Sequence, residues 1–318
     1  MTYLFYIIWN ANPEIISGFP PRWYGLLFAS GFLFGSYIMR WIYKLDNRNP
    51  EEVERLTVYM VFSTIIGARL GHCLFYDPIY YLSNPIKILY IWEGGLASHG
   101  AAIAIILGMI IYSKKAGETF FWVIDRIVIV VCLAGAFIRT GNFMNSEILG
   151  FQTETGSGVV FARSVNDILM YRFDGRVDEI TFHKRDGESN ERGVPMTIRL
   201  KYGEGVGIDE EYENNYYAEI YTIGIPRHPA QLYEAFYCLL LFFGLLMLWY
   251  YKRKEINDGF IFSIFMIVLW SLRILDELLK ENQVDWEADI PLNMGQWLSI
   301  PMIILGLIIF FKTYPRNK

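Results

Sequence analysis

The chain has 318 residues, of which 53% are hydrophobic and only 19% are charged. Soluble globular proteins usually carry about 25% charged residues, so this composition argues against a soluble protein. The formal net charge is -5 and no basic patch of nucleic-acid size occurs, which excludes nucleic-acid binding.

The apolar residues gather in blocks separated by charged gaps. About 20 helical residues cross the roughly 30 Å hydrocarbon layer of a membrane, and each block approaches that length. The first apolar segment, Leu4 to Trp9, is too short to span and is expected at the membrane interface. We therefore expect an all-α polytopic membrane protein with about seven transmembrane helices, at residues 23–42, 56–75, 99–114, 121–142, 230–251, 259–280 and 296–312.

Two pairs of glycines predict where helices pack closely. Gly31 and Gly35 lie four residues apart in the first span, and Gly67 and Gly71 have the same spacing in the second. Glycine at this spacing lets two helix backbones approach each other. We therefore expect these faces to be packing faces.

The orientation of the chain follows from the Lys and Arg residues near the ends of the spans. They are concentrated around residues 44, 115, 253 and 316, in the gaps after the first, third, fifth and seventh spans. Basic loops remain on the cytoplasmic side. We therefore expect the N-terminus outside and the C-terminus in the cytoplasm.

A long hydrophilic stretch separates the fourth span from the fifth, and this orientation places it on the external side. Residues 175–183 and 196–202 alternate in polarity, which indicates a few strands. We expect a small, partly β external head at residues 151–226. The remaining regions are residues 1–150, with helices one to four, and residues 227–318, with helices five to seven.

The three cysteines are not expected to carry chemistry. Cys73, Cys132 and Cys238 fall inside or at the edge of apolar spans, and none forms a Cys-x-x-Cys pair. This pattern predicts neither a disulfide framework nor a zinc site. We expect small, buried apolar residues.

Ionisable side chains inside a membrane span are costly, so each needs a physical reason. Several lie near the external ends of the predicted spans, and His99 is the first, in Gly94-Gly-Leu-Ala-Ser-His99-Gly. Histidine titrates near neutral pH and can move a proton. The alternative is a hydrogen-bonded structural histidine.

A second polar group ends the fourth span. Arg139, Asn142 and Asn145 are spaced by three, so they lie on nearly one helix face. One guanidinium and two amides suit a phosphate or ester head group. Hydrogen bonding between helices is the alternative.

The other two groups lie in the fifth and sixth spans. Arg273 and Glu277 are four residues apart and can also simply neutralise each other. Residues 227–234 bring Arg, His, Gln, Tyr and Glu together at the entry to the fifth span, and Arg69 lies at a comparable depth in the second. Several arginines on one side of the membrane, with His and carboxylates, indicate a site for an anionic lipid.

These motifs together resemble the phosphatidylglycerol:prolipoprotein diacylglyceryl transferase family. The resemblance runs from Arg22-Trp-Tyr-Gly25 to Met294-Gly-Gln-Trp-Leu-Ser-Ile-Pro301, and its most specific stretch is residues 139–147 with Gly150. It implies transfer of a diacylglyceryl group from phosphatidylglycerol to the thiol of the lipobox cysteine of a preprolipoprotein. Glycerol phosphate leaves and a thioether forms, with no metal and no organic cofactor. The resemblance also implies a location in the bacterial cytoplasmic (inner) membrane, with the active site toward the outer leaflet.

The resemblance also implies roles for individual residues. Arg139 and Arg273 would hold the lipid phosphate, and His99 would assist deprotonation of the thiol. The further substrate-binding candidates are Arg69, Asn142, Asn145, Glu147, Gly150, Tyr24, Tyr76, Tyr233, Glu234 and Glu277. The chemistry fits these residues, because arginines stabilise a leaving phosphate bidentately. A thiol of pKa about 8.5 needs a base near neutral pH.

The chain departs from the family pattern at two positions. Leu269 stands where the family often has a tyrosine, four residues before Arg273, and Ile138 stands where it commonly has glycine. A polytopic transporter of an anionic or lipid substrate is the alternative function. It would want charged groups near the membrane midplane and internal repeats, and the sequence has no such repeat.

Overall fold

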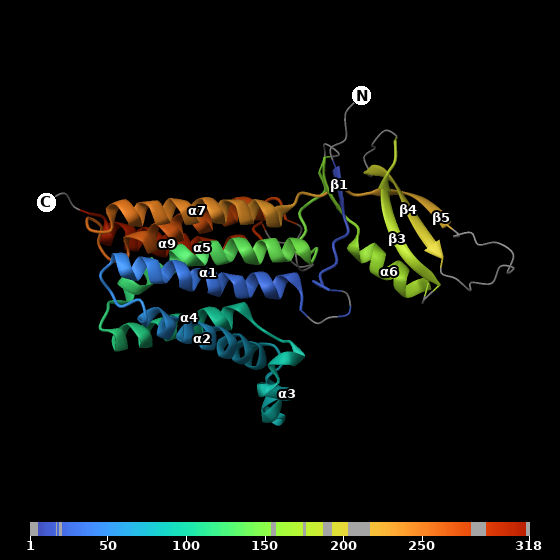
Figure 1. Ribbon diagram of the computed structural model, residues 1–318. Helices are drawn as coiled ribbons and strands as arrows, with labels where there is room; N and C mark the ends of the chain where they lie inside the picture. Colours follow the sequence, from blue (N-terminus) through green and yellow to red (C-terminus); the bar gives the residue numbers. More distant parts are fainter. Residues whose placement is uncertain are drawn as a thin grey trace. The chain divides into compact units, whose positions relative to one another are not determined.

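The computed structural model describes residues 6–16, 18, 21–153, 157–173, 176–186, 193–202, 217–280 and 291–315. These residues are mostly helical and include two small sheets (Figure 1). The long helices are α1 (Trp23–Leu45), α2 (Glu52–Phe75), α4 (Ser98–Ala116), α5 (Phe120–Met144), α7 (Ala230–Lys252), α8 (Phe260–Glu277) and α9 (Met294–Thr313). The short helical pieces are α3 (Pro78–Ser83), η1 (Pro85–Leu89), η2 (Ile91–Glu93) and α6 (Arg163–Phe173).

Five of the long helices are long and apolar enough to cross a membrane, namely α1, α2, α5, α7 and α9. The chain is thus a polytopic membrane protein. All seven predicted segments are helical, but α4 ends in two lysines, and α8 carries Arg273, Asp276 and Glu277 in its last turns. That α4 and α8 also cross the membrane remains a prediction.

The chain forms two compact units, and five of the long helices contribute residues to both. The head unit comprises Met1–Phe28, Ala136–Tyr237 and Leu272–Ser299. The helical unit comprises Ala29–Gly135, Cys238–Ser271 and Ile300–Lys318. The expected boundaries at residues 150 and 226 separate the membrane helices from the external head, and they remain a prediction.

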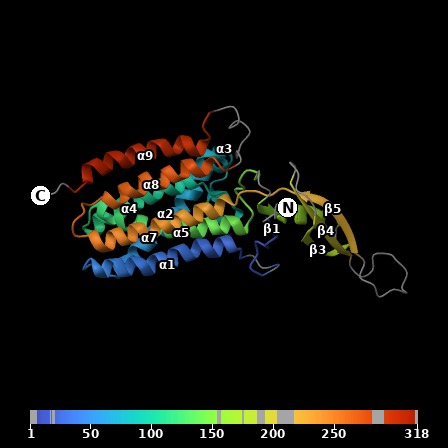
Figure 2. The same cartoon turned by 90° about the horizontal axis from the view of Figure 1, so that it is seen from above.

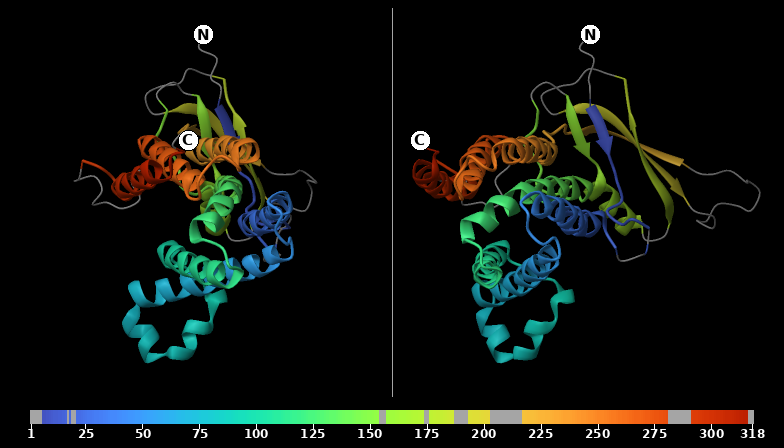
Figure 3. Two further views of the ribbon diagram at one scale, coloured as in Figure 1. Left: turned by 90° about the vertical axis from the view of Figure 1, so that its left-hand side faces the viewer. Right: turned by 60° about the vertical axis from the view of Figure 1, so that its left-hand side comes forward.

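Both sheets belong to the head unit, and Figure 3 shows their strands. β1 (Tyr6–Trp9) pairs in parallel with β2 (Gly158–Phe161). The antiparallel sheet consists of β3 (Val177–Lys184), β4 (Val194–Tyr202) and β5 (Tyr217–Gly224), with β4 in the middle. The alternating runs in the sequence are confirmed as β3 and β4, and residues 6–9 of the segment expected at the membrane interface form β1.

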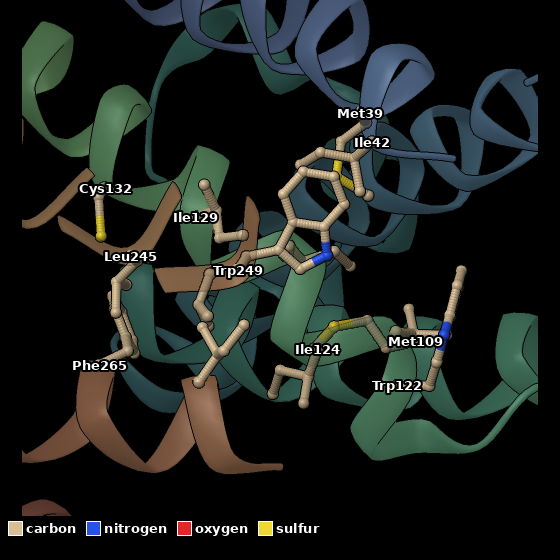
Figure 4. Packing of buried hydrophobic residues seen from close by; sticks show 14 of the residues in the cluster. Met39, Ile42, Met109, Trp122, Ile124, Ile129, Cys132, Leu245, Trp249 and Phe265 are labelled. Atoms are coloured by element: carbon tan, nitrogen blue, oxygen red, sulfur yellow. The ribbon is translucent and has the colours of Figure 1, made fainter. Parts of the chain in front are cut away.

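The helical unit has one large apolar core (Figure 4). Ile42 of α1, Ile129 of α5 and Trp249 of α7 are fully buried in it. The cysteines Cys73, Cys132 and Cys238 are buried, as predicted, and none of them forms a disulfide within the described residues.

Helices α2 and α4 of the helical unit pack side by side (Figures 1 and 2). A Cβ atom on Gly100 would lie 2.3 Å from the carbonyl oxygen of Gly67, and one on Gly71 would lie 2.7 Å from the Cα of Gly100. Only glycine permits such an approach, so the predicted packing role of Gly67 and Gly71 is confirmed. Residues 76–97, called the arm below, connect the two helices through α3, η1 and η2.

Candidate functional site

A buried carboxylate, Glu234, forms the centre of the polar residues in the head unit. It lies in the second turn of α7 and its side chain is 8% exposed. Its Oε1 lies 2.8 Å from Arg139 Nε and 2.8 Å from Arg273 Nη1, and its Oε2 lies 2.8 Å from Lys280 Nζ. Residues from three separate segments therefore place three cations around one anion.

Two further carboxylates, those of Asp276 and Glu277, precede Lys280 by four and three residues. Asp276 Oδ2 is 2.6 Å and Glu277 Oε1 is 3.4 Å from its ammonium nitrogen. Glu277 also pairs with Arg273 at 2.5 Å and accepts a hydrogen bond of 3.0 Å from the Asn293 amide. Three cations and three anions thus form the ionic cluster, whose members are Arg139, Arg273, Lys280, Glu234, Asp276 and Glu277.

An amide network extends from Arg139 to the end of α5. Arg139 Nη1 donates to Asn142 Oδ1 at 3.3 Å. Asn142 and Asn145 each donate from Nδ2 to the carboxylate of Glu147, at 3.0 and 3.2 Å. The predicted face of one guanidinium and two amides therefore exists, and Glu147 closes it.

The turn after α5 is strained. Ser146 and Ile148 have φ angles of 55° and 56°, a region that residues other than glycine rarely adopt. Gln231, which is fully buried, donates from its amide to the carbonyl oxygen of Glu147. Such strain costs about 1–3 kcal/mol per residue and often occurs at functional sites.

Gly150 lies where three backbone segments meet. A Cβ atom there would be 2.4 Å from the carbonyl oxygen of His228 and 2.9 Å from that of Leu279. Gly150 also forms a β-bridge with Lys280 and accepts a hydrogen bond of 3.1 Å from Arg227. No larger residue fits without moving the segment that carries Lys280.

The two tyrosine candidates of the head unit contact its polar segments. Tyr24 of α1 lies against α5, since a Cβ atom on Gly141 would be 3.0 Å from its ring. The hydroxyl of Tyr233 lies 3.3 Å from Nδ1 of His228.

Arg69 belongs to the helical unit, where it is 3% exposed. Its guanidinium donates to the carbonyl oxygens of Lys87 at 2.6 Å, Ile88 at 2.9 Å and Gly94 at 2.6 Å. It also lies over the ring of Tyr81, at 5.0 Å. Arg69 therefore ties both ends of a loop in the arm to α2.

His99 lies in the first turn of α4 and is exposed. Its ring centre is 5.3 Å from that of Phe75 and 5.8 Å from that of Tyr76. His72 stacks on Tyr76 at 5.4 Å. Two histidines and a tyrosine thus line one side of α2, where it meets the arm.

The predicted site residues therefore fall into two groups. The head unit brings together Arg139, Arg273, Glu234 and Glu277, and it connects Arg139 to the Asn142, Asn145 and Glu147 network. The helical unit contains Arg69, Tyr76 and His99. That His99 meets the two arginines at one substrate remains a prediction.

Sequence reasoning missed the part that Lys280 plays. The predicted sixth span ends at this residue, to which the sequence pattern assigned no role. Its spacing was the available signal, because Asp276 and Glu277 precede it by four and three residues. Asn293, which holds Glu277, was also missed, although it directly precedes the Met294–Pro301 motif.

Comparison with known proteins identifies the family. Residues 13–312 match the sequence profile described as prolipoprotein diacylglyceryl transferase. A phosphatidylglycerol–prolipoprotein diacylglyceryl transferase of Tolumonas auensis is 36% identical over 95% of this chain and 96% of its own length. Proteins of the same name from Chloroherpeton thalassium and Bacteroides fragilis are 34% and 33% identical, each over 98% of this chain and 96% of its own length. The chain belongs to the prolipoprotein diacylglyceryl transferase family.

Proposed function

We propose that this protein, a transferase of bacterial lipoprotein maturation by family, moves the diacylglyceryl group of phosphatidylglycerol to the lipobox cysteine of a preprolipoprotein. The observation that carries the proposal is the convergence of Arg139 and Arg273 on one carboxylate oxygen of Glu234. Two guanidiniums that already share one anion can share a phosphate, which fits their fork of donors. The family match does not favour a transporter.

The proposed step is a displacement at carbon. The thiolate sulfur forms a bond to the glycerol carbon of the diacylglyceryl group that carries the phosphate. The bond between that carbon and the phosphate oxygen breaks. The electron pair goes to that oxygen, so the leaving glycerol phosphate gains negative charge. Arg139 and Arg273 would stabilise this charge as it develops. The products are the thioether of the peptide and glycerol phosphate.

The thiol must lose its proton before or during attack. We assign this proton to His99, because its imidazole is exposed in the first turn of α4, shortly after two glycines, and imidazole is the side chain most often used as a general base. The ring of Tyr76 lies beside it, tilted and with the ring centres 5.8 Å apart, and is a candidate contact for the peptide or the lipid.

The remaining candidates would shape the cavity for the head group. Asn142, Asn145 and Glu147 would orient Arg139. Gly150 lets the neighbouring backbone segments approach each other closely, because it has no side chain. Tyr24 and Tyr233 would contact substrate from α1 and α7. For Arg69 the contacts favour an indirect part, because its donors bind arm carbonyls and thereby fix the approach to His99.

The proposed topology has seven spans, including α4 and α8. Helices α1, α4, α7 and α9 each end in a basic last turn, which supports a cytoplasmic location for those four ends. The N-terminus and the head at residues 151–226 would then lie on the periplasmic side, with the site toward the outer leaflet. Reporter fusions at Lys318 and within residues 180–186 test this, and a cytoplasmic head would overturn it.

The activity itself is tested with purified full-length protein, phosphatidylglycerol vesicles and a synthetic lipobox peptide. Mass spectrometry should show a peptide heavier by one diacylglyceryl group, together with released glycerol phosphate. Phosphatidylethanolamine vesicles and a peptide with Ala in place of its cysteine are the controls. Transfer that is absent with phosphatidylglycerol, or equal with both lipids, would contradict the proposal.

A further inference from the structure

Lys280 is the most deeply buried cation of the ionic cluster. Its side chain is 1% exposed, whereas those of Arg139 and Arg273 are 21% and 19% exposed. An arriving anion therefore reaches the arginines and not the lysine. Lys280 lies among the carboxylates, with Glu234 and Asp276 both within 2.8 Å of its ammonium nitrogen.

The binding of a phosphate creates an electrostatic problem for Glu234. In the structure its carboxylate has three cationic partners, and two of them are the arginines that the phosphate would take. A buried carboxylate that loses its counter-charges is strongly destabilised. Without a remaining cation, this cost would oppose lipid binding.

We propose that Lys280 is a positioning residue that holds the Glu234 carboxylate when Arg139 and Arg273 turn to the lipid phosphate. The inference rests on the proposed function, because it takes the phosphate of phosphatidylglycerol as the arriving anion. Lys280 touches no substrate and acts through Glu234. Its contribution therefore falls on lipid affinity more than on the chemical step.

Asp276 supplies the competing explanation. It is 5% exposed, and Lys280 is its ion-pair partner. Lys280 could thus serve only to neutralise Asp276, which is a purely structural part. Removing both charges together separates the two explanations. The arginines then still balance Glu234 and Glu277, so the cluster remains neutral.

The experiment compares Lys280→Met with the double variant Lys280→Met/Asp276→Asn in the full-length protein. The dissociation constant for phosphatidylglycerol in mixed micelles, kcat for the lipobox peptide and the thermal unfolding midpoint are measured. Both variants should bind the lipid about 10-fold or more weakly, with a smaller change in kcat. Only the single variant should lose thermal stability. Lys252→Met/Glu255→Gln, which removes an exposed ion pair, is the matched control.

A double variant that binds the lipid as tightly as the wild type would overturn the inference and leave Lys280 a structural residue. A second measurement applies even if the double variant fails to fold. In a Glu234→Gln background, Lys280→Met should change the lipid dissociation constant little, because the carboxylate it holds is gone. An equal loss of affinity in both backgrounds would also overturn the inference. A wild-type protein that binds the lipid but transfers nothing would instead contradict the proposed function.

Discussion

The ionic cluster and the contact between α2 and the arm both contain arginine, but they satisfy the guanidinium differently. Arg139 and Arg273 pair with carboxylates, whereas Arg69 donates to backbone carbonyls of residues 87–94. An arriving phosphate can replace a carboxylate as the partner of an arginine, because both are anions. Backbone carbonyls are part of the fold and release their arginine only if the arm opens. The first arrangement suits ligand exchange, and the second suits fixed positioning.

The largest effect is expected at His99, which follows the arm that Arg69 fixes. His99→Gln should lower kcat about 10²- to 10⁴-fold, the usual contribution of a general base, with little change in lipid affinity. The measurement is kcat at saturating lipid beside the dissociation constant for phosphatidylglycerol. The control is His183→Gln on β3, whose imidazole is exposed and pairs with Thr181. A near-normal rate in His99→Gln would mean that this histidine is structural. The region next to the arm would then contribute no catalytic group.

The next effect concerns the arginines of the ionic cluster. Arg139→Lys and Arg273→Lys keep the charge but lose the fork of donors. Loss of one charge-assisted contact corresponds to about 1.5–3 kcal/mol, or roughly 10- to 150-fold in lipid affinity. Titration with phosphatidylglycerol measures it. The effects of the two substitutions should be less than additive, since both residues are expected to bind one ligand.

Exchanging the members of one ion pair tests this interpretation of Arg273. Its guanidinium lies 2.5 Å from Glu277 and 2.8 Å from Glu234. A residue that only neutralises Glu277 should tolerate Arg273→Glu combined with Glu277→Arg. We expect that swap to remain inactive, because the phosphate would lose one of its two guanidiniums. Restored activity would remove Arg273 from the proposed phosphate site.

The next prediction concerns Arg69, whose backbone carbonyl partners are not expected to be exchanged for a ligand. Arg69→Lys leaves one ammonium to replace donors that reach Lys87, Ile88 and Gly94, so at least one charged hydrogen bond of about 1.5–3 kcal/mol is lost. Hydrogen exchange of residues 85–97 should accelerate, while lipid affinity should change little. Gly95→Ala should have a similar effect, because its φ is +71° and its Cβ would lie 2.5 Å from the His72 ring. A large loss of lipid affinity with an unchanged arm would show that Arg69 contacts the phosphate directly.

The sequence predicted the helices well because long apolar blocks are the strongest pattern that a chain can carry. It also marked Arg139, Arg273, Glu234 and Glu277 as candidates, because a charge inside an apolar block is conspicuous. The structure brings these four side chains together, and their roles remain a prediction. The position of Lys280 depends instead on tertiary pairing. Gly150 forms a bridge with it and so fixes the backbone just beyond α8. Strand β1 was missed for a similar reason, since a short apolar run indicates a strand only when its partner, β2, is known.

The smallest effect is expected at Asp125, the acidic counterpart of Arg69. It is 1% exposed in the helical unit, and its carboxylate accepts hydrogen bonds of 2.7 Å from the backbone N–H groups of Gly259 and Phe262. It therefore caps the start of α8 from a neighbouring helix and, like Arg69, is held by the backbone and not by an exchangeable ion. Asp125→Ala should lower the free energy of unfolding by about 0.5–2 kcal/mol, the usual cost of a lost helix cap. Asp125→Asn keeps one acceptor and should lose less. Thermal unfolding in detergent measures both, with lipid affinity as the second readout. An Asp125→Ala protein of unchanged stability but weakened lipid binding would contradict this comparison. In the comparison, charged side chains that pair with backbone groups stabilise the fold, and only the ionic cluster exchanges its partners with a ligand.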